Sequence, residues 1–160
     1  MAVSVGDPIP DVQLQVFEGG APRPVRSSDV LGSGRVVLFA VPGAFTPTCS
    51  DHHLPGFKIR ADDLKAKGVD TIACLSVNDA FVMGAWARAQ GIGDDIVMLA
   101  DGNAEFTKAM GLELDATAAG LGIRSQRYAA IVEDGRISQL FVEPERGLSV
   151  SSAESVLEAL

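Results

Sequence analysis

One stretch of the chain, RVVLFAVPGAFTPTCS at residues 35–50, decides the fold that we predict. Residues 35–41 are almost continuously apolar, which is typical of a short strand that is buried on both faces of a sheet. Pro42 and Gly43 end that strand, and apolar residues at helical spacing begin near Cys49. The stretch therefore predicts a strand, a tight turn and a helix, with Cys49 at the start of the helix.

The segments on either side of this stretch continue the alternation of strands and helices. Short apolar runs predict the strands, and apolar residues three or four positions apart predict the helices. Asp134 and Gly135 are the kind of pair that closes a tight hairpin. In chain order we expect a hairpin over residues 12–25, strands at 35–41, 71–77 and 96–100 that each precede a helix, a hairpin over 128–142, and a last helix up to 160.

This order of elements predicts the fold class. Strands that alternate with helices favour right-handed crossovers and a mostly parallel sheet. A closing hairpin followed by a terminal helix is how the thioredoxin-like fold ends. We therefore predict a thioredoxin-like α/β fold, with a central mixed, mostly parallel sheet flanked by helices and an N-terminal hairpin as an extension. No repeat or linker divides the chain, so residues 1–160 are expected to form one domain.

Polar residues and glycines mark the expected ends of the helices. Asn78 and Asp101 are predicted caps, because such side chains accept hydrogen bonds from the free N–H groups of a first turn. Residues 151–154, SSAE, have the spacing of a capping box before the last helix. Pro55 lies early in the helix that follows the cysteine and is expected to kink it, and Gly68 is its stop signal.

Composition excludes several classes of partner. The net charge is -8 and the sequence pI is about 4.6, so the surface repels phosphate backbones and nucleic acid is not an expected partner. No apolar run approaches the roughly 18–20 residues of a membrane span, so no membrane association is expected. The first residues, MAVSVGD, lack the basic start and apolar core of a secretory signal. We expect a cytoplasmic protein, or an organellar one if a transit peptide has been removed.

Cys49 is the candidate reactive group. It follows the carboxyl end of a buried strand, where sites of open α/β sheets lie, and it begins a helix whose free N–H groups and dipole favour a negative charge. A cysteine there is expected to ionise readily. Thr46, three residues earlier, would share a helical face with it, and its hydroxyl can donate to one partner while accepting from another. A threonine at this spacing, unlike a cysteine, cannot close a local disulfide.

Other reactive residues have simpler explanations. A cysteine without context is usually a small buried apolar group, and this explanation is favoured for Cys74, which lies inside a predicted strand. His52 and His53 follow Cys49 closely, but neither is a clear general base. A histidine pair without a third ligand is also a weak metal site, so no metal is expected.

Residues 42–49, PGAFTPTC, followed by HLPGF at 53–57, resemble the active-site segment of the peroxiredoxins, and of their type II (peroxiredoxin-five) subgroup in particular. This resemblance implies that Cys49 is the peroxidatic cysteine and Thr46 the site threonine. It also implies that Pro42 shields the thiolate. The likeness continues through residues 76–79, 81–83, 86, 124–132, 142–143 and 151–154.

The resemblance also implies a site arginine at the start of a late strand. Arg127 matches it, with Arg124 as the near competitor, and the sequence by itself does not choose between them. A guanidinium is always charged and can donate to two atoms, which suits the negative charge that develops when a peroxide bond breaks. Pro42 and Gly43, with Leu121 and Ile123, are the candidate lining of the peroxide pocket.

The family also implies how the oxidised enzyme is recycled. Cys49 would become a sulfenic acid. Some type II members carry a late resolving cysteine, but residues 147–152 read GLSVSS here. Cys74 matches the second cysteine of plant-like members, yet a strand residue and a helix-start residue need rearrangement to bond. We expect an external reductant, glutathione with glutaredoxin or else thioredoxin, together with a homodimer and no bound cofactor.

The predicted function is thus a thiol peroxidase that reduces hydrogen peroxide and alkyl hydroperoxides. The alternative is a redox sensor or thiol-switched binding module that uses the same cysteine. A cysteine hydrolase is disfavoured, because it needs a positioned histidine, and His52 and His53 are too close to Cys49 in sequence to serve as one.

Overall fold

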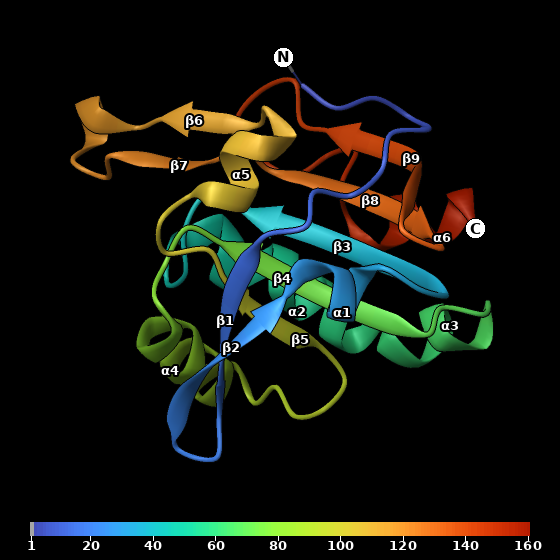
Figure 1. The fold of residues 1–160 in the computed structure, drawn as a ribbon, viewed down its shortest axis with the longest axis horizontal. Helices are drawn as coiled ribbons and strands as arrows, with labels where there is room; N and C mark the ends of the chain where they lie inside the picture. Colours follow the sequence, from blue (N-terminus) through green and yellow to red (C-terminus); the bar gives the residue numbers. More distant parts are fainter. Residues whose placement is uncertain (1) are drawn as a thin grey trace.

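A computed structural model describes residues 2–160 of the chain, and a seven-stranded sheet forms its centre (Figure 1). The strand order is β2-β1-β5-β4-β3-β8-β9, and β6 and β7 form a separate two-stranded sheet. The strands are β1 (Gln13–Glu18), β2 (Ala21–Arg26), β3 (Arg35–Val41), β4 (Thr71–Ser76), β5 (Val97–Ala100), β6 (Glu113–Asp115), β7 (Ile123–Ser125), β8 (Tyr128–Glu133) and β9 (Arg136–Val142).

Helices cover both faces of this sheet (Figure 1). One apolar core lies between the sheet and α2 (Leu54–Ile59), α3 (Ala61–Ala66), α4 (Ala80–Gln90) and α6 (Ala153–Ala159). The other core lies under α1 (Ser27–Leu31) and α5 (Glu105–Met110). The elements match the thioredoxin-like α/β fold that the sequence predicts.

Strand β3 is at the centre of the sheet, as its apolar run predicts. It pairs in parallel with β4 and antiparallel with β8, and β4 in turn pairs in parallel with β5. Its residues alternate between the two cores, so that Val37 and Phe39 face one and Leu38 and Ala40 face the other. Burial on both faces explains why the run is continuously apolar.

The segment after β3 departs from the single kinked helix that we expect. A π-turn over Cys49–His53 leads into α2, and the chain bends at Arg60 before α3. In an α-helix the ring of Pro55 would clash with the carbonyl group four residues earlier, and a wider turn in front of it relieves this clash. The irregularity therefore precedes Pro55.

Two predicted caps are wrong by one residue. Asp79, and not Asn78, caps α4, because its carboxylate accepts from the N–H of Val82 at 2.8 Å. Before α6 the cap is Ser152, whose hydroxyl accepts from the N–H of Ser155 at 3.2 Å, so the capping-box register that starts at residue 151 is not formed. In both places the residue next to the helix has the extended backbone that capping needs.

Asp101 does serve the start of α5, although it lies several residues ahead of it. Its carboxylate accepts from the N–H groups of Phe106 and Thr107, at 3.2 and 2.8 Å. The expected turn at Asp134 and Gly135 is also present, with φ angles of 49° and 80°. Positive φ at both positions is what a tight hairpin turn requires.

Neither α1 nor the β6–β7 hairpin is predicted from the sequence. Strands β6 and β7 have three residues each, and every residue of β6 is exposed, so no apolar alternation marks them. The hairpin projects to one side of the main sheet (Figure 1). Within residues 2–160, no helix combines the length and the apolar character that crossing a membrane requires.

Candidate active site

The loop after β3 is held in shape by its own backbone and by a neighbouring strand. The Thr46 hydroxyl donates to the carbonyl of Gly43 at 2.7 Å, and Phe45 has a positive φ of 65°. The N–H of Ala44 donates to the side-chain oxygen of Asn78 at 3.0 Å. Asn78 thus ties this loop to the end of β4, a role that its sequence position as a predicted cap did not reveal.

Cys49 lies in the first turn after this loop. The helical hydrogen bond from the N–H of Ser50 to the carbonyl of Thr46, 2.9 Å long, shows that the turn has already closed at this point. The Cys49 residue has no exposed surface, and it packs among the apolar residues of the core under α2 and α4. A negative charge on its sulfur therefore needs donors inside the protein.

Arg127 provides such a donor. Its Nη2 group donates to the Cys49 sulfur at 3.2 Å, and the residue is only 9% exposed. The sheet creates this contact: Tyr128 pairs with Ala40, which places the residue before Tyr128 beside the carboxyl end of β3. Residues 78 positions apart in the chain are thereby brought together.

His53 holds the other side of the guanidinium. Its Nδ1 lies 2.9 Å from Arg127 Nη1, and its Nε2 lies 2.9 Å from the carbonyl oxygen of Ser151. A guanidinium can only donate and a carbonyl can only accept, so the proton is on Nε2 and Nδ1 accepts. Burial lowers the pKa of His53 to about 4, and the charge of Arg127 acts in the same direction. The imidazole is therefore neutral near pH 7.

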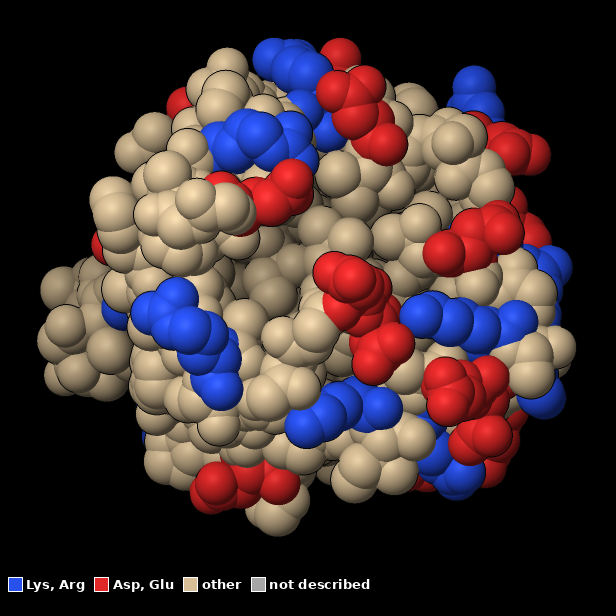
Figure 2. Space-filling view, turned by 90° about the horizontal axis from the view of Figure 1, so that it is seen from below, with Lys and Arg blue, Asp and Glu red and all other residues tan. Residues whose placement is uncertain are grey.

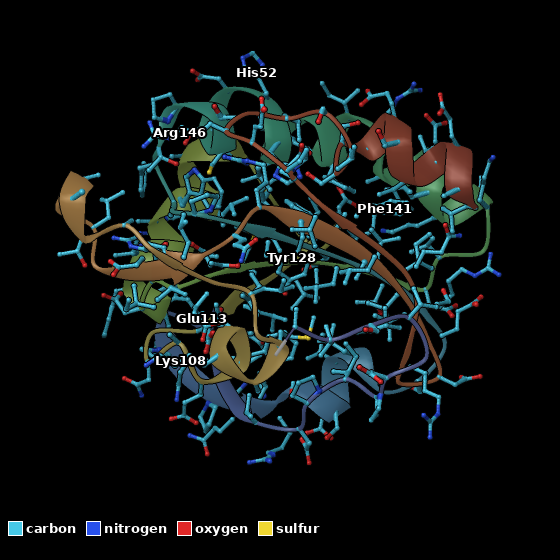
Figure 3. All side chains as sticks on the ribbon, turned by 90° about the horizontal axis from the view of Figure 1, so that it is seen from above. His52, Lys108, Glu113, Tyr128, Phe141 and Arg146 are labelled. Carbon is cyan, nitrogen blue, oxygen red and sulfur yellow. The ribbon has the colours of Figure 1, made fainter. Side chains whose placement is uncertain are left out.

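The sequence pattern does not predict this role of His53. From the sequence, only a general base and a metal ligand suggest themselves for this histidine, and neither is favoured. Its position four residues after Cys49 is the signal that could have found it, because side chains at this spacing share one face of a helix. His52 is different: it is exposed and lies at the outer edge of the molecule (Figure 3).

Arg127 forms no ion pair with a carboxylate among residues 2–160. A nearly buried guanidinium without a counter-ion is costly. Its two side-chain partners here are a neutral imidazole and the Cys49 sulfur. The guanidinium is therefore placed to donate to the Cys49 sulfur without competition from a carboxylate in the described residues.

Arg124 has a different task. Its Nε donates to the carbonyl of Leu121 at 2.9 Å, and its Nη1 approaches the carbonyl of Pro42 at 3.5 Å. It joins the β6–β7 hairpin to the loop in front of Cys49. Of the two candidate arginines, Arg127 is the one that contacts the sulfur.

Three further candidate residues lie in two settings. Leu121 and Ile123, just before and at the start of β7, are each 38% exposed, so ordinary burial does not account for them. Cys74 is a buried thiol in β4 and forms no disulfide with Cys49. Burial, together with the nearby Cys49, raises the pKa of Cys74. Among the residues described, no cluster of three or more His, Cys, Asp or Glu side chains could hold a metal ion.

Comparison with known proteins agrees with this arrangement. A family model described as Redoxin matches residues 4–157. Peroxiredoxin-2E-2, chloroplastic, of Oryza sativa subsp. japonica is 50% identical over 163 residues, which cover 99% of this chain and 72% of that relative.

The chain belongs to the type II peroxiredoxins. Another relative in this family, peroxiredoxin-2B of Arabidopsis thaliana, is 45% identical over 99% of this chain and 98% of its own length. The crystal structure of reduced Prx3 from Vibrio vulnificus in complex with H2O2 has a TM-score of 0.93 and 50% identity, and the match covers 98% of each chain. As a peroxiredoxin, this protein is a thiol peroxidase whose peroxidatic cysteine is Cys49, next to Arg127.

Proposed function

We propose that this peroxiredoxin reduces hydrogen peroxide and small alkyl hydroperoxides, with Arg127 and Thr46 assisting Cys49. The observation that carries the proposal is the 3.2 Å contact between Arg127 Nη2 and the Cys49 sulfur. A structure similar to this chain is that of a protein in complex with H2O2, which supports the same class of substrate here.

In the proposed first step, the thiolate of Cys49 attacks one peroxide oxygen. A sulfur–oxygen bond forms, the O–O bond breaks, and the departing oxygen takes a proton and leaves as water or an alcohol. Cys49 becomes a sulfenic acid. Arg127 is in position to stabilise the charge that develops on the departing oxygen. Thr46 already donates to the carbonyl of Gly43, so its lone pairs remain free to accept the peroxide O–H.

The second half of the proposal is that an external thiol recycles the enzyme, glutathione with glutaredoxin first and thioredoxin second. Cys74 is fully buried in a strand and its thiol resists ionisation, which makes it a poor attacking group. An external thiol would attack the sulfenic acid, releasing water and forming a mixed disulfide. A second thiol would then release Cys49.

The test is peroxide consumption with each donor system, for the wild type, Cys49→Ser and Cys74→Ser. We expect Cys49→Ser to be inactive and Cys74→Ser to keep its turnover with glutathione and glutaredoxin. Peroxide consumption by Cys49→Ser would contradict the role of that sulfur. Loss of turnover in Cys74→Ser, with a normal first oxidation, would instead assign the resolving role to Cys74. Oxidation without turnover for every donor would favour the redox sensor.

We further propose a homodimer. Phe45 in the active-site loop and Phe81 in the first turn of α4 are 54% and 64% exposed, which suits an apolar contact beside the site. Sedimentation of the wild type and of Phe45→Ser measures the oligomeric state. We expect a dimer for the wild type and a weaker dimer for Phe45→Ser, and a monomeric wild type would contradict the proposal. The cytoplasmic location stays a prediction, because one relative is named as chloroplastic.

A further inference from the structure

The hydrogen bonds around Arg127 continue to a segment far from the sulfur. The carbonyl of Ser151, which holds the His53 imidazole, belongs to the loop between β9 and α6. Glu143, directly after β9, organises this loop. Its carboxylate accepts from the N–H groups of Ser149, Val150 and Ser151, at 2.9, 2.9 and 2.8 Å. It also accepts from the hydroxyls of Ser149 and Ser151, both at 2.6 Å.

Glu143 is also fixed to Arg127 through its backbone, because its N–H donates to the carbonyl of Arg127 at 3.0 Å. A closed ring of contacts results. It runs from the Arg127 backbone to Glu143, on to the Ser151 segment, through the His53 imidazole, and back to the Arg127 guanidinium. Cys49 lies just outside this ring, where its sulfur accepts from Arg127 Nη2.

The negative charge of Glu143 is stabilised by hydrogen-bond donors of this loop and not by a cation. It forms no ion pair among residues 2–160. Partial burial alone would raise its pKa, but the donors of Ser149 and Ser151 outweigh this and lower the pKa to about 2. The carboxylate is therefore ionised throughout the range in which peroxide reduction would be measured. A carboxylate that accepts five hydrogen bonds from one short loop holds that loop firmly.

We propose that Glu143 is a positioning residue for the reaction at Cys49, acting through the Ser151 carbonyl and His53 on the guanidinium of Arg127. The inference rests on the proposed function. If the loop shifts, the Nε2–H group of His53 loses its acceptor, and the imidazole ring is no longer fixed in its orientation. Nδ1 would then turn away from Arg127 Nη1, and the guanidinium would lose the acceptor that holds it beside the sulfur.

The test compares Glu143→Gln with Glu145→Gln. The first variant keeps the shape of the side chain and removes its charge, and the second changes an exposed glutamate of the same segment. The rate of the first reaction with hydrogen peroxide can be followed through Trp86, the sole tryptophan, whose indole N–H donates to Ser50 beside the reacting cysteine. We expect Glu143→Gln to slow this step about tenfold, a size typical of indirect coupling, and Glu145→Gln to match the wild type.

A double variant separates positioning from a general loosening of the fold. Glu143→Gln is made again in a His53→Gln background, where the contacts that link the Ser151 carbonyl to Arg127 are already lost. We expect no further loss of rate there. An equal loss in both backgrounds would overturn the proposal, as would an unchanged rate in folded Glu143→Gln that only melts at a lower temperature. If Glu143→Gln does not fold, Ser151→Ala replaces it, because this variant removes one hydroxyl donor and keeps the carboxylate. We expect Ser151→Ala to slow the reaction with hydrogen peroxide by less than tenfold, and an unchanged rate would overturn the proposal.

The wild type and Cys49→Ser serve as reference in the same assay. If the wild type does not react with peroxide, the proposed function fails and Glu143 has no reaction to assist. If the wild type reacts and Glu143→Gln reacts equally fast, the proposed function stands and the positioning role of Glu143 is wrong.

Discussion

At the scale of single residues, the site depends on where one charge is placed. Arg127 is nearly buried, contacts the Cys49 sulfur through one nitrogen and is held by neutral His53 through another. A planar guanidinium can make both contacts at once. A lysine offers a single ammonium group and cannot reproduce this geometry.

We therefore predict that Arg127→Lys slows the reaction of Cys49 with hydrogen peroxide about a hundredfold, the usual cost of losing a transition-state donor. Arg124→Lys is the matched control, because it makes the same exchange at an arginine whose side chain donates to the carbonyls of Leu121 and Pro42 and not to the Cys49 sulfur. Its effect should be much smaller. Stopped-flow fluorescence measures both rates, and equal losses in the two variants would contradict the assignment of Arg127.

Thr46 is tested by Thr46→Val, which keeps the shape of the side chain and removes the hydroxyl. The hydroxyl donates to Gly43, so its loss affects both the loop and the proposed acceptor for the peroxide O–H. We expect a loss of about tenfold or more in the rate with hydrogen peroxide, as for other removed hydrogen-bonding groups of active sites. Thr48→Val, the same exchange two residues later, provides the comparison, and an unchanged rate in Thr46→Val would contradict the role of Thr46.

At the scale of elements, the position of the site depends on how closely the helices approach the sheet. Helix α4 lies against β1, and a Cβ atom at Gly84 would lie 2.6 Å from the Phe17 ring and 2.9 Å from its Cβ. The absence of a side chain at Gly84 permits this approach. In α2, by contrast, a Cβ atom at Gly56 would have no neighbour within 4 Å.

These two glycines form a matched pair. Gly84→Ala should lower the free energy of unfolding by about 1–2 kcal/mol, because overpacking against Phe17 exceeds the gain in helix propensity. Gly56→Ala should raise it by about 0.5–1 kcal/mol, because only the propensity changes. Urea unfolding measures both values. A stabilised Gly84→Ala would show that α4 can move away from β1 without cost.

At the scale of the whole molecule, two buried or partly buried groups resist protonation in the folded state. The pKa of His53 is lowered to about 4 by burial, and that of Glu143 is lowered to about 2 by its donors although partial burial opposes this. In each case the unfolded chain binds a proton at a higher pH than the folded protein does. Folding stability therefore falls as the pH falls, first through His53 and then through Glu143.

For His53 this window runs from its ordinary value near 6.5 down to about 4. Between pH 7.5 and pH 5, the histidine should account for a loss of about 2 kcal/mol in the free energy of unfolding. His53→Gln should lack this part of the pH dependence, whereas His52→Gln, at an exposed site, should keep it. Urea unfolding at the two pH values provides the comparison, and the same slope in both variants would contradict the neutral state of His53.

The surface of the molecule adds a more general effect. Its net charge is -8, and Figure 2 shows acidic and basic side chains interspersed over one face rather than gathered in one patch. On this face the interspersed charges of both signs produce no large field of a single sign.

The order of the strands and helices follows from local sequence patterns, because each pattern is formed by residues that are close together along the chain. The apolar run of β3, the turn at Pro42 and Gly43, and the helix start at Cys49 follow from residues 35–50 alone. The sequence also led to the family through its resemblance. The caps at Asn78 and at residues 151–154 were misplaced by one position, since several polar residues in a row offer the same local signal.

The tertiary structure alone decided which arginine meets the sulfur and what holds it there. Arg124 and Arg127 differ by three positions, and only the antiparallel pairing of β8 with β3 brings the second to Cys49. The contact of His53 with Ser151 spans 98 positions. Contacts over such distances depend on the register of the sheet and the packing of its layers, which no short stretch of sequence contains.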